Sequence, residues 1–97
     1  MSILMEVLEE ELDRLNRQEI VYKRDLQELP KGYISKKRIK GREYCYLQRR
    51  EGGKVLSHYI SAEDLPMMEA QIVKRKRLEE AIRRVKEDRA KLRKVLG

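Results

Sequence analysis

Two turn signals divide residues 33–60 into three short runs, and this division constrains the fold more than any other feature of the chain. The runs are rich in Tyr, Ile and Val, which favour β-strands. Gly52-Gly53 suits a two-residue type I′ turn, because both central residues of that turn need a positive φ. Gly41-Arg42 suits a type II′ turn, which needs glycine at its first central position. The stretch therefore predicts a three-stranded antiparallel β-meander.

Side chains alternate along a strand, so the predicted pairing assigns them to two faces. Counting outward from the turns places Ile39 opposite Tyr44 and Tyr46 opposite Tyr59. Both faces mix apolar and basic residues, so the pattern leaves open which face packs against the rest of the chain. We expect the more purely apolar set to face inward, namely Cys45, Leu47, Leu56 and Ile60.

Apolar residues with heptad spacing precede the sheet and predict a long helix over residues 1–29, for which Ser2 is a suitable N-cap. Glu19 interrupts this stripe. An unpaired buried carboxylate is costly, so we expect Glu19 to meet a basic residue of the second helix or of a symmetry mate. A second apolar stripe, with Ser61 as its cap, predicts a helix over residues 62–96.

The charges are divided unevenly along the chain. Residues 1–19 carry a net charge of −4 and residues 61–97 one of +4, so the flanks of two antiparallel helices attract each other. The sequence thus predicts one α+β domain over residues 1–97. In it, two long helices form a coiled-coil-like antiparallel hairpin and flank the three-stranded antiparallel β-meander. The regular heptad of the first helix also predicts a homodimer through that helix.

Composition limits the classes of function. One cysteine cannot form an internal disulfide, which favours a reducing compartment, and no run approaches the ~20 apolar residues of a membrane span. We therefore expect a cytoplasmic protein with no membrane contact. Cys45 and His58 share a predicted face, but no orienting acid or oxyanion site accompanies them. Because metal-ligand spacing and a phosphate-binding glycine loop are also absent, we predict a protein that is not an enzyme and uses no cofactor or metal.

The best functional signal is basic charge interleaved with tyrosine. The chain has a net charge of +7, and residues 31–60 hold nine basic residues and two acidic ones. Basic side chains neutralise phosphates and tyrosine rings stack on unpaired bases, so DNA or RNA is the expected partner. The alternative is that these residues only keep a small sheet and a helix surface solvated. The predicted contacts are Lys36, Lys37, Arg38, Lys40, Arg42, Tyr44, Tyr46, Arg49, Arg50, Tyr59, Lys74, Arg75, Lys76 and Arg77.

The sequence therefore predicts a non-enzymatic nucleic-acid-binding module that uses a basic, tyrosine-containing sheet and a basic C-terminal helix. The alternative is a protein-interaction module, such as a phage or mobile-element protein that docks on a larger host protein or ribonucleoprotein complex. Two long helices on a chain with little core suit an assembly that a partner completes.

A resemblance covers the string from Leu29 to Ile60, LPKGYISKKRIKGREYCYLQRREGGKVLSHYI. Its features are the Leu-Pro-Lys-Gly entry, Gly-Arg-Glu-Tyr before a Tyr-x-Tyr-Leu-Gln strand, and Gly-Lys-Val leading to Tyr-Ile. With these, the string resembles a small basic module of uncharacterised proteins from Firmicutes and their mobile elements, and the resemblance implies no activity. More loosely, a basic three-stranded sheet is similar to the arm-binding domains of phage-type integrases, which grip DNA through the sheet. The long flanking helices depart from that pattern.

Overall fold

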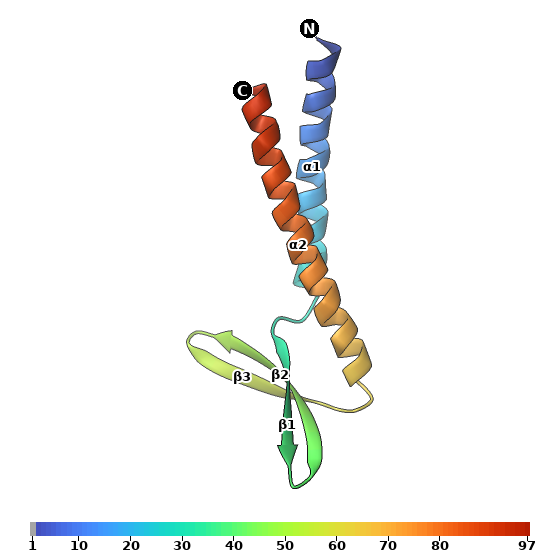
Figure 1. Cartoon of the computed structure of the whole chain (residues 1–97), viewed down its shortest axis with the longest axis vertical. Coiled ribbons are helices and arrows are strands. Elements are labelled where there is room, and N and C mark those ends of the chain that lie inside the picture. The colour runs from blue at the N-terminus through green and yellow to red at the C-terminus, as the bar shows by residue number, and fades with distance from the viewer. Residues whose placement is uncertain (1) are drawn as a thin grey trace. The chain divides into compact units, whose positions relative to one another are not determined.

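The computed structural model describes residues 2–97 and has the α+β fold that the sequence predicts (Figure 1). The described chain divides into two compact units: a helical hairpin, made of residues up to 28 and from 77 to 97, and a sheet unit, made of residues 29–76. The prediction of a single domain over the whole chain stays a prediction. In order, the elements are α1 (Ile3–Gln27), β1 (Tyr33–Ile39), β2 (Arg42–Glu51), β3 (Lys54–Ile60) and α2 (Leu65–Leu96).

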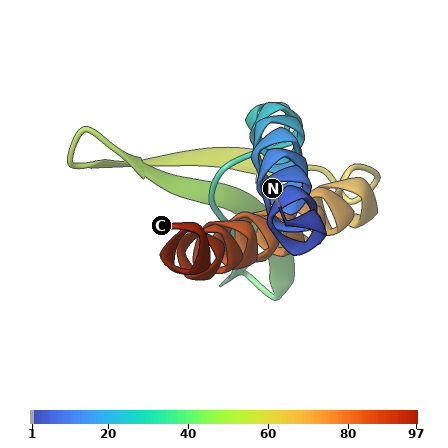
Figure 2. The same ribbon diagram turned by 90° about the horizontal axis from the view of Figure 1, so that it is seen from above.

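The three strands form one antiparallel sheet in the order β1-β2-β3. β2 is the longest strand, and its first part pairs with β1 whereas its last part pairs with β3. The sheet is therefore three strands wide only over Cys45–Gln48, and a two-stranded ribbon extends from each side of this centre. Figure 1 shows the β1–β2 turn at the bottom and the β2–β3 turn on the left. From above, the β2–β3 ribbon is a long twisted pair of strands (Figure 2).

The turn between β1 and β2 lies one residue earlier than predicted. Its central residues are Lys40 and Gly41, whose φ angles of 50° and 80° are the positive pair of a type I′ turn. Ile39 consequently pairs with Arg42, and the predicted pairing with Tyr44 is wrong. A type I′ turn follows the right-handed twist of the strands, which offsets the cost of placing a lysine at positive φ. The pairing is shifted by two residues, so every side chain keeps its predicted face.

The second turn is the predicted one. Gly52 and Gly53 have φ angles of 58° and 79°, which fit a type I′ turn, and Tyr46 pairs with Tyr59.

The inward face of the sheet is also the predicted one. Cys45, Leu47 and Ile60 are each at most 8% exposed, and they form a core with Ile72 of α2. Leu56, the fourth member of the predicted set, is half-buried. Full burial of a side chain of this size contributes about 1.5–3 kcal/mol, so this small cluster accounts for much of the stability of the sheet unit. Three partly buried residues surround it: Ile34, Leu65 and Met68.

The segment that leads into β1 is held by two contacts. Gly32 has a φ of 121°, and a Cβ at this position would overlap the carbonyl oxygen of Gln48 in β2. Only glycine accommodates both that φ and that close approach. A little earlier, the carbonyl oxygen of Leu29 accepts a hydrogen bond of 3.0 Å from Nη1 of Arg75 in α2.

α1 ends at Gln27, two residues before the predicted end, and α2 begins three residues later than predicted. The predicted first helical position, Met1, lies outside the described residues. In α1, Ser2 is the predicted N-cap, and its hydroxyl accepts the N–H of Leu4 at 3.2 Å. α2 begins at Leu65, which places Pro66 in the first turn, where its missing N–H leaves no hydrogen bond unmade. Ser61 still contributes, because its carbonyl oxygen accepts the N–H of Leu65 at 3.0 Å. Within residues 2–97, no helix is both long enough and apolar enough to cross a membrane.

In the helical hairpin, α1 and the last part of α2 run antiparallel, as predicted (Figure 1). Leu15, Ile82 and Val85 are buried there, together with the carboxylate of Glu19. Arg89 donates a hydrogen bond through Nη1 to Glu19.

This contact confirms that Glu19 meets a basic residue of the second helix. Lys23 adds an ion pair, with 2.9 Å between its Nζ and Oε2 of Glu19. Arg89 also donates to Oδ1 of Asn16 at 3.1 Å. The carboxylate that interrupts the heptad is therefore neutralised rather than buried alone.

Candidate nucleic-acid interface

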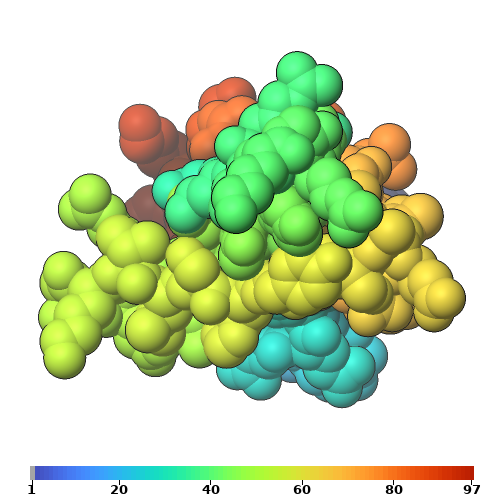
Figure 3. Space-filling view, turned by 90° about the horizontal axis from the view of Figure 1, so that it is seen from below, coloured from blue at the N-terminus to red at the C-terminus, as the bar shows by residue number. Residues whose placement is uncertain are grey.

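The candidate interface is the face of the sheet opposite its core, which we call the outer face. The structure describes every strand residue, and none of those on this face is buried. It carries three cations and no carboxylate, because the two strand glutamates, Glu43 and Glu51, belong to the other face. Figure 3 shows the end of the β2–β3 ribbon projecting on the left. The outer face consists of Tyr33, Ser35, Lys37, Ile39, Arg42, Tyr44, Tyr46, Gln48, Arg50, Val55, Ser57 and Tyr59.

Three tyrosines cluster near the centre of the outer face. The ring centroid of Tyr59 lies 5.9 Å from that of Tyr46 and 6.4 Å from that of Tyr44. The interplanar angles are 68° and 54°, so the rings meet edge to face or tilted rather than stacked flat. Tyr59 therefore has ring neighbours on one side while 61% of the residue remains exposed. The cluster therefore presents a supported aromatic surface to solvent.

The cations of the outer face surround these rings. Nζ of Lys37 lies 5.3 Å from the ring centroid of Tyr46, within cation–π range. Arg42 lies at the β1–β2 turn, opposite Ile39, and Arg50 lies near the β2–β3 turn, opposite Val55. A cation thus stands at each end of β2 on this face.

The structure separates the predicted contact residues of the sheet into two faces and a turn. Lys36 and Arg49 are on the inward face, at 3.8 Å and 3.3 Å from the carboxylates of Glu43 and Glu51 respectively. Arg38 is also on that face, opposite Glu43, and Lys40 lies in the turn. Six of the predicted residues share the outer face: Lys37, Arg42, Tyr44, Tyr46, Arg50 and Tyr59.

The predicted basic run of α2, residues 74–77, does not form one continuous surface. Four consecutive helical residues spread around the axis at about 100° each. Arg75 is half-buried and donates to the Leu29 carbonyl oxygen, whereas Lys74, Lys76 and Arg77 are exposed.

The predicted contact residues do not include Tyr33, although the structure places it on the same face as six of them. It is 56% exposed and lies on the outer face, opposite Gln48. Strand alternation was sufficient to find it, because Tyr33 has the same parity along β1 as Lys37.

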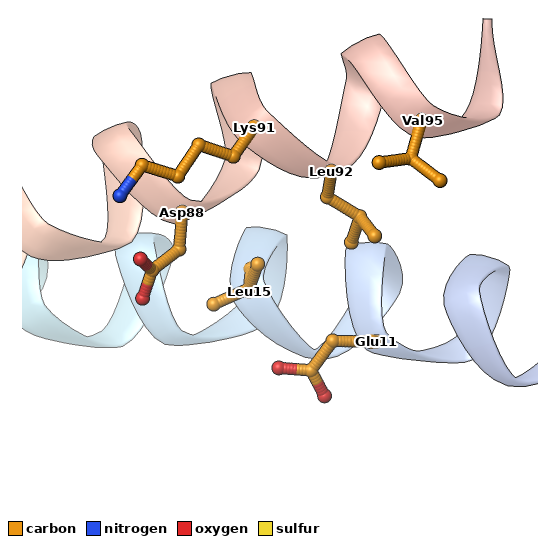
Figure 4. A pocket seen from close by; sticks show the side chains of 6 residues that line it. All are labelled: Glu11, Leu15, Asp88, Lys91, Leu92 and Val95. Atoms are coloured by element: carbon orange, nitrogen blue, oxygen red, sulfur yellow. The ribbon is translucent and has the colours of Figure 1, made fainter.

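The helical hairpin contains a shallow groove with a volume of about 310 Å³. Figure 4 shows Leu92 of α2 pointing toward α1, which carries Leu15, and the side chain of Asp88 between the two helices. Within residues 2–97, no group of three or more His, Cys, Asp or Glu side chains is arranged to hold a metal ion. The groove is lined by Glu11, Leu15, Asp88, Lys91, Leu92 and Val95.

Comparison with known proteins places the chain in a family without assigning it an activity. No curated protein and no solved structure matches it. The family model of a domain of unknown function, DUF6788, matches residues 6–70. This match spans most of α1, the whole sheet and the start of α2, which is more than half of the chain. The chain therefore belongs to the DUF6788 family.

Proposed function

We propose that the chain is a non-enzymatic nucleic-acid-binding module and that the outer face of its sheet is the contact surface. The observation that carries this proposal is the charge of that face, which has three cations and no carboxylate. A polyanion approaching the face meets attraction without local repulsion. The net charge of +7 over the chain adds a long-range attraction of the same sign.

The geometry supports different roles for the basic residues. Lys37, Arg42 and Arg50 are the phosphate contacts of the outer face, and Lys40 extends that set at the turn. Lys36 and Arg49 already have carboxylate neighbours, so they contribute less. The exposed lysines of α2 add to the overall positive potential. The single cysteine favours a cytoplasmic location, which belongs to the same proposal.

Fluorescence anisotropy with short labelled oligonucleotides, both single-stranded and duplex, tests this function. Neutralisation of three phosphates on a single strand gives a slope of about −2 for log affinity against log salt. Affinity should therefore fall roughly 20-fold between about 50 and 200 mM salt. Absence of binding to both kinds of oligonucleotide at the lower salt concentration excludes the proposal.

A second candidate function is protein interaction through α1. Its first turns expose three apolar side chains, with Ile3 80%, Leu4 65% and Val7 52% exposed. The occupant we propose is a second copy of the chain, because two copies related by a two-fold axis would cover this exposed apolar patch on both chains at once. Light scattering at about 100 μM should give the mass of a dimer for the wild type and of a monomer for Val7→Asp. A monomeric wild-type mass contradicts this candidate.

A further inference from the structure

We infer that the outer face binds the unpaired bases of a single-stranded nucleic acid in preference to a duplex. This inference rests on the proposed function and specifies its ligand. Tyrosine rings at the centre of the face, and cations at its ends, are the observations that carry it.

The exposed tyrosine rings of the outer face can stack only on bases whose flat faces are uncovered. In a duplex each base face is covered by its neighbours, so a protein reaches only base edges, sugars and phosphates. Tyr59 and Tyr33 expose 61% and 56% of their surface on the outer face. Stacking on unpaired bases uses that ring surface, whereas docking in a groove leaves it without a matching partner.

The spacing of these two rings also disfavours a stacked helix. Tyr33 is on β1 and Tyr59 is on β3, with β2 between them. Two strand spacings separate their Cα atoms by at least about 9–10 Å, which is well above the ~3.4 Å between stacked bases. A nucleic acid that contacts both rings must therefore have these two bases unstacked from each other. A single-stranded nucleic acid permits this, whereas a duplex resists it.

The outer side of β2 forms a continuous track for such a nucleic-acid strand. Along β2 this face presents Arg42, Tyr44, Tyr46, Gln48 and Arg50, that is, a cation, two rings, an amide and a second cation. The two arginines are eight residues apart, or about 26 Å along a strand. Phosphates at the two ends and bases over the centre fit this order.

The decisive comparison uses three probes of equal length: a single strand, its duplex, and a single strand of abasic sites. The abasic strand keeps the phosphates and lacks the bases. If bases stack on the outer face, the single strand binds at least about ten-fold more tightly than the abasic strand, and also more tightly than the duplex. The chain contains no Trp and four of its five tyrosines lie on the outer face, so quenching of tyrosine emission by the bound strand reports contact with that face.

Substitution of Tyr59 gives a second, independent measurement. Tyr59→Leu should weaken binding of the single strand about ten-fold and leave binding of the abasic strand unchanged, whereas Tyr59→Phe keeps the ring and the affinity. His58→Leu is the matched control, since His58 is the exposed neighbour on the other face of β3. Circular dichroism verifies that each variant is folded.

The outcomes separate this inference from the proposed function. Equal binding of normal and abasic strands, or preference for the duplex, overturns the inference while nucleic-acid binding stands. No binding of any probe overturns both. Preference for the normal single strand, with loss in Tyr59→Leu and not in His58→Leu, supports both.

Discussion

The two compact units of the chain build their cores from different materials. In the sheet unit the described buried side chains, such as Leu47 and Ile60, are apolar. The helical hairpin buries apolar residues as well, but places the Glu19–Arg89 ion pair among them. The stability of an apolar core does not depend on the ionisation of any side chain. A buried charge, in contrast, is tolerated only while its partner is present and ionised. Truncation of a core side chain should therefore destabilise the sheet unit, and removal of one partner of the buried ion pair should destabilise the hairpin.

The largest expected effect is a cavity in the sheet core. Leu47→Ala removes a side chain that is 8% exposed, and should lower the free energy of unfolding by about 2–4 kcal/mol in urea titrations. Val55→Ala is the control, because Val55 is 54% exposed on the outer face, and its effect should stay within about 0.5 kcal/mol. Equal losses in the two variants would contradict the assignment of the inward face.

Loss of one ion-pair partner should come next. Arg89→Met leaves the carboxylate of Glu19 in the apolar seam with Lys23 as its remaining cation. We expect about 2–3 kcal/mol of destabilisation, because Lys23 and solvent still reach the edge of this carboxylate. The double variant Glu19→Leu with Arg89→Met removes both charges and should recover most of that loss. If the double variant is no more stable than Arg89→Met, the ion pair is not what sets the stability of the seam.

Acid should weaken the hairpin through the same carboxylate. Hydrogen bonds from Arg89 and then Lys23 lower the pKa of Glu19 from 4.5 to about 2. Because the pKa is lower in the folded chain, the ionised group stabilises the hairpin fully above pH 4.5, and this contribution is lost as the pH falls from 4.5 towards 2.

Helical circular dichroism across that range, in the wild type and in Glu19→Gln, measures the contribution of Glu19 by difference. Glu11 and Glu80 also have a lowered pKa, owing to hydrogen bonds from Arg14 and Arg83, but their side chains are 41% and 44% exposed and are the same in both proteins. Superimposable acid profiles for wild type and variant would contradict the role of Glu19.

The smallest expected effect on stability belongs to the outer face, where binding should change instead. Replacement of Lys37, Arg42 and Arg50 together by Gln should reduce the salt slope of nucleic-acid binding by about 2 and leave the free energy of unfolding within about 0.5 kcal/mol.

A matched triple on the inward face tests whether position or mere charge matters. Lys36, Arg38 and Lys54 are exposed, and their replacement by Gln removes the same total charge. This control should keep most of the salt slope. Equal losses of binding in the two triples would show that overall charge, and not the outer face, attracts the ligand.

Periodicity was sufficient to predict most of the fold from the sequence. Heptad spacing predicted the first helix, a second apolar stripe predicted the other helix, strand alternation predicted the inward face, and Gly52-Gly53 predicted the second turn. The first turn was misplaced because Lys40 adopts a positive φ that its residue type disfavours, so local preference pointed to Gly41 as the first central residue. Strand twist, which acts on the whole hairpin, decided the turn instead.

The candidate site was less predictable than the fold. The sequence presents Lys36, Lys37 and Arg38 as one basic run, and only pairing assigns Lys37 to one face and its neighbours to the other. Proximity of Lys36 to Glu43, and the half-burial of Arg75, depend on strand and helix packing that a charge count does not contain. Glu19 was predictable as a buried acid, but its partner Arg89 is 70 residues away.

The separation of 70 residues between Glu19 and Arg89 affects the order in which the two units fold. A contact between residues so far apart in the sequence forms slowly when the segment between them is a random coil, because loop-closure entropy grows with length. Here the segment contains a meander in which every strand pairs with its sequence neighbour. Such local pairings form early, and the formed meander shortens the effective loop between the helices. We therefore expect the sheet to form first in refolding experiments. The two helices should then pack against each other in a chain that is already partly compact.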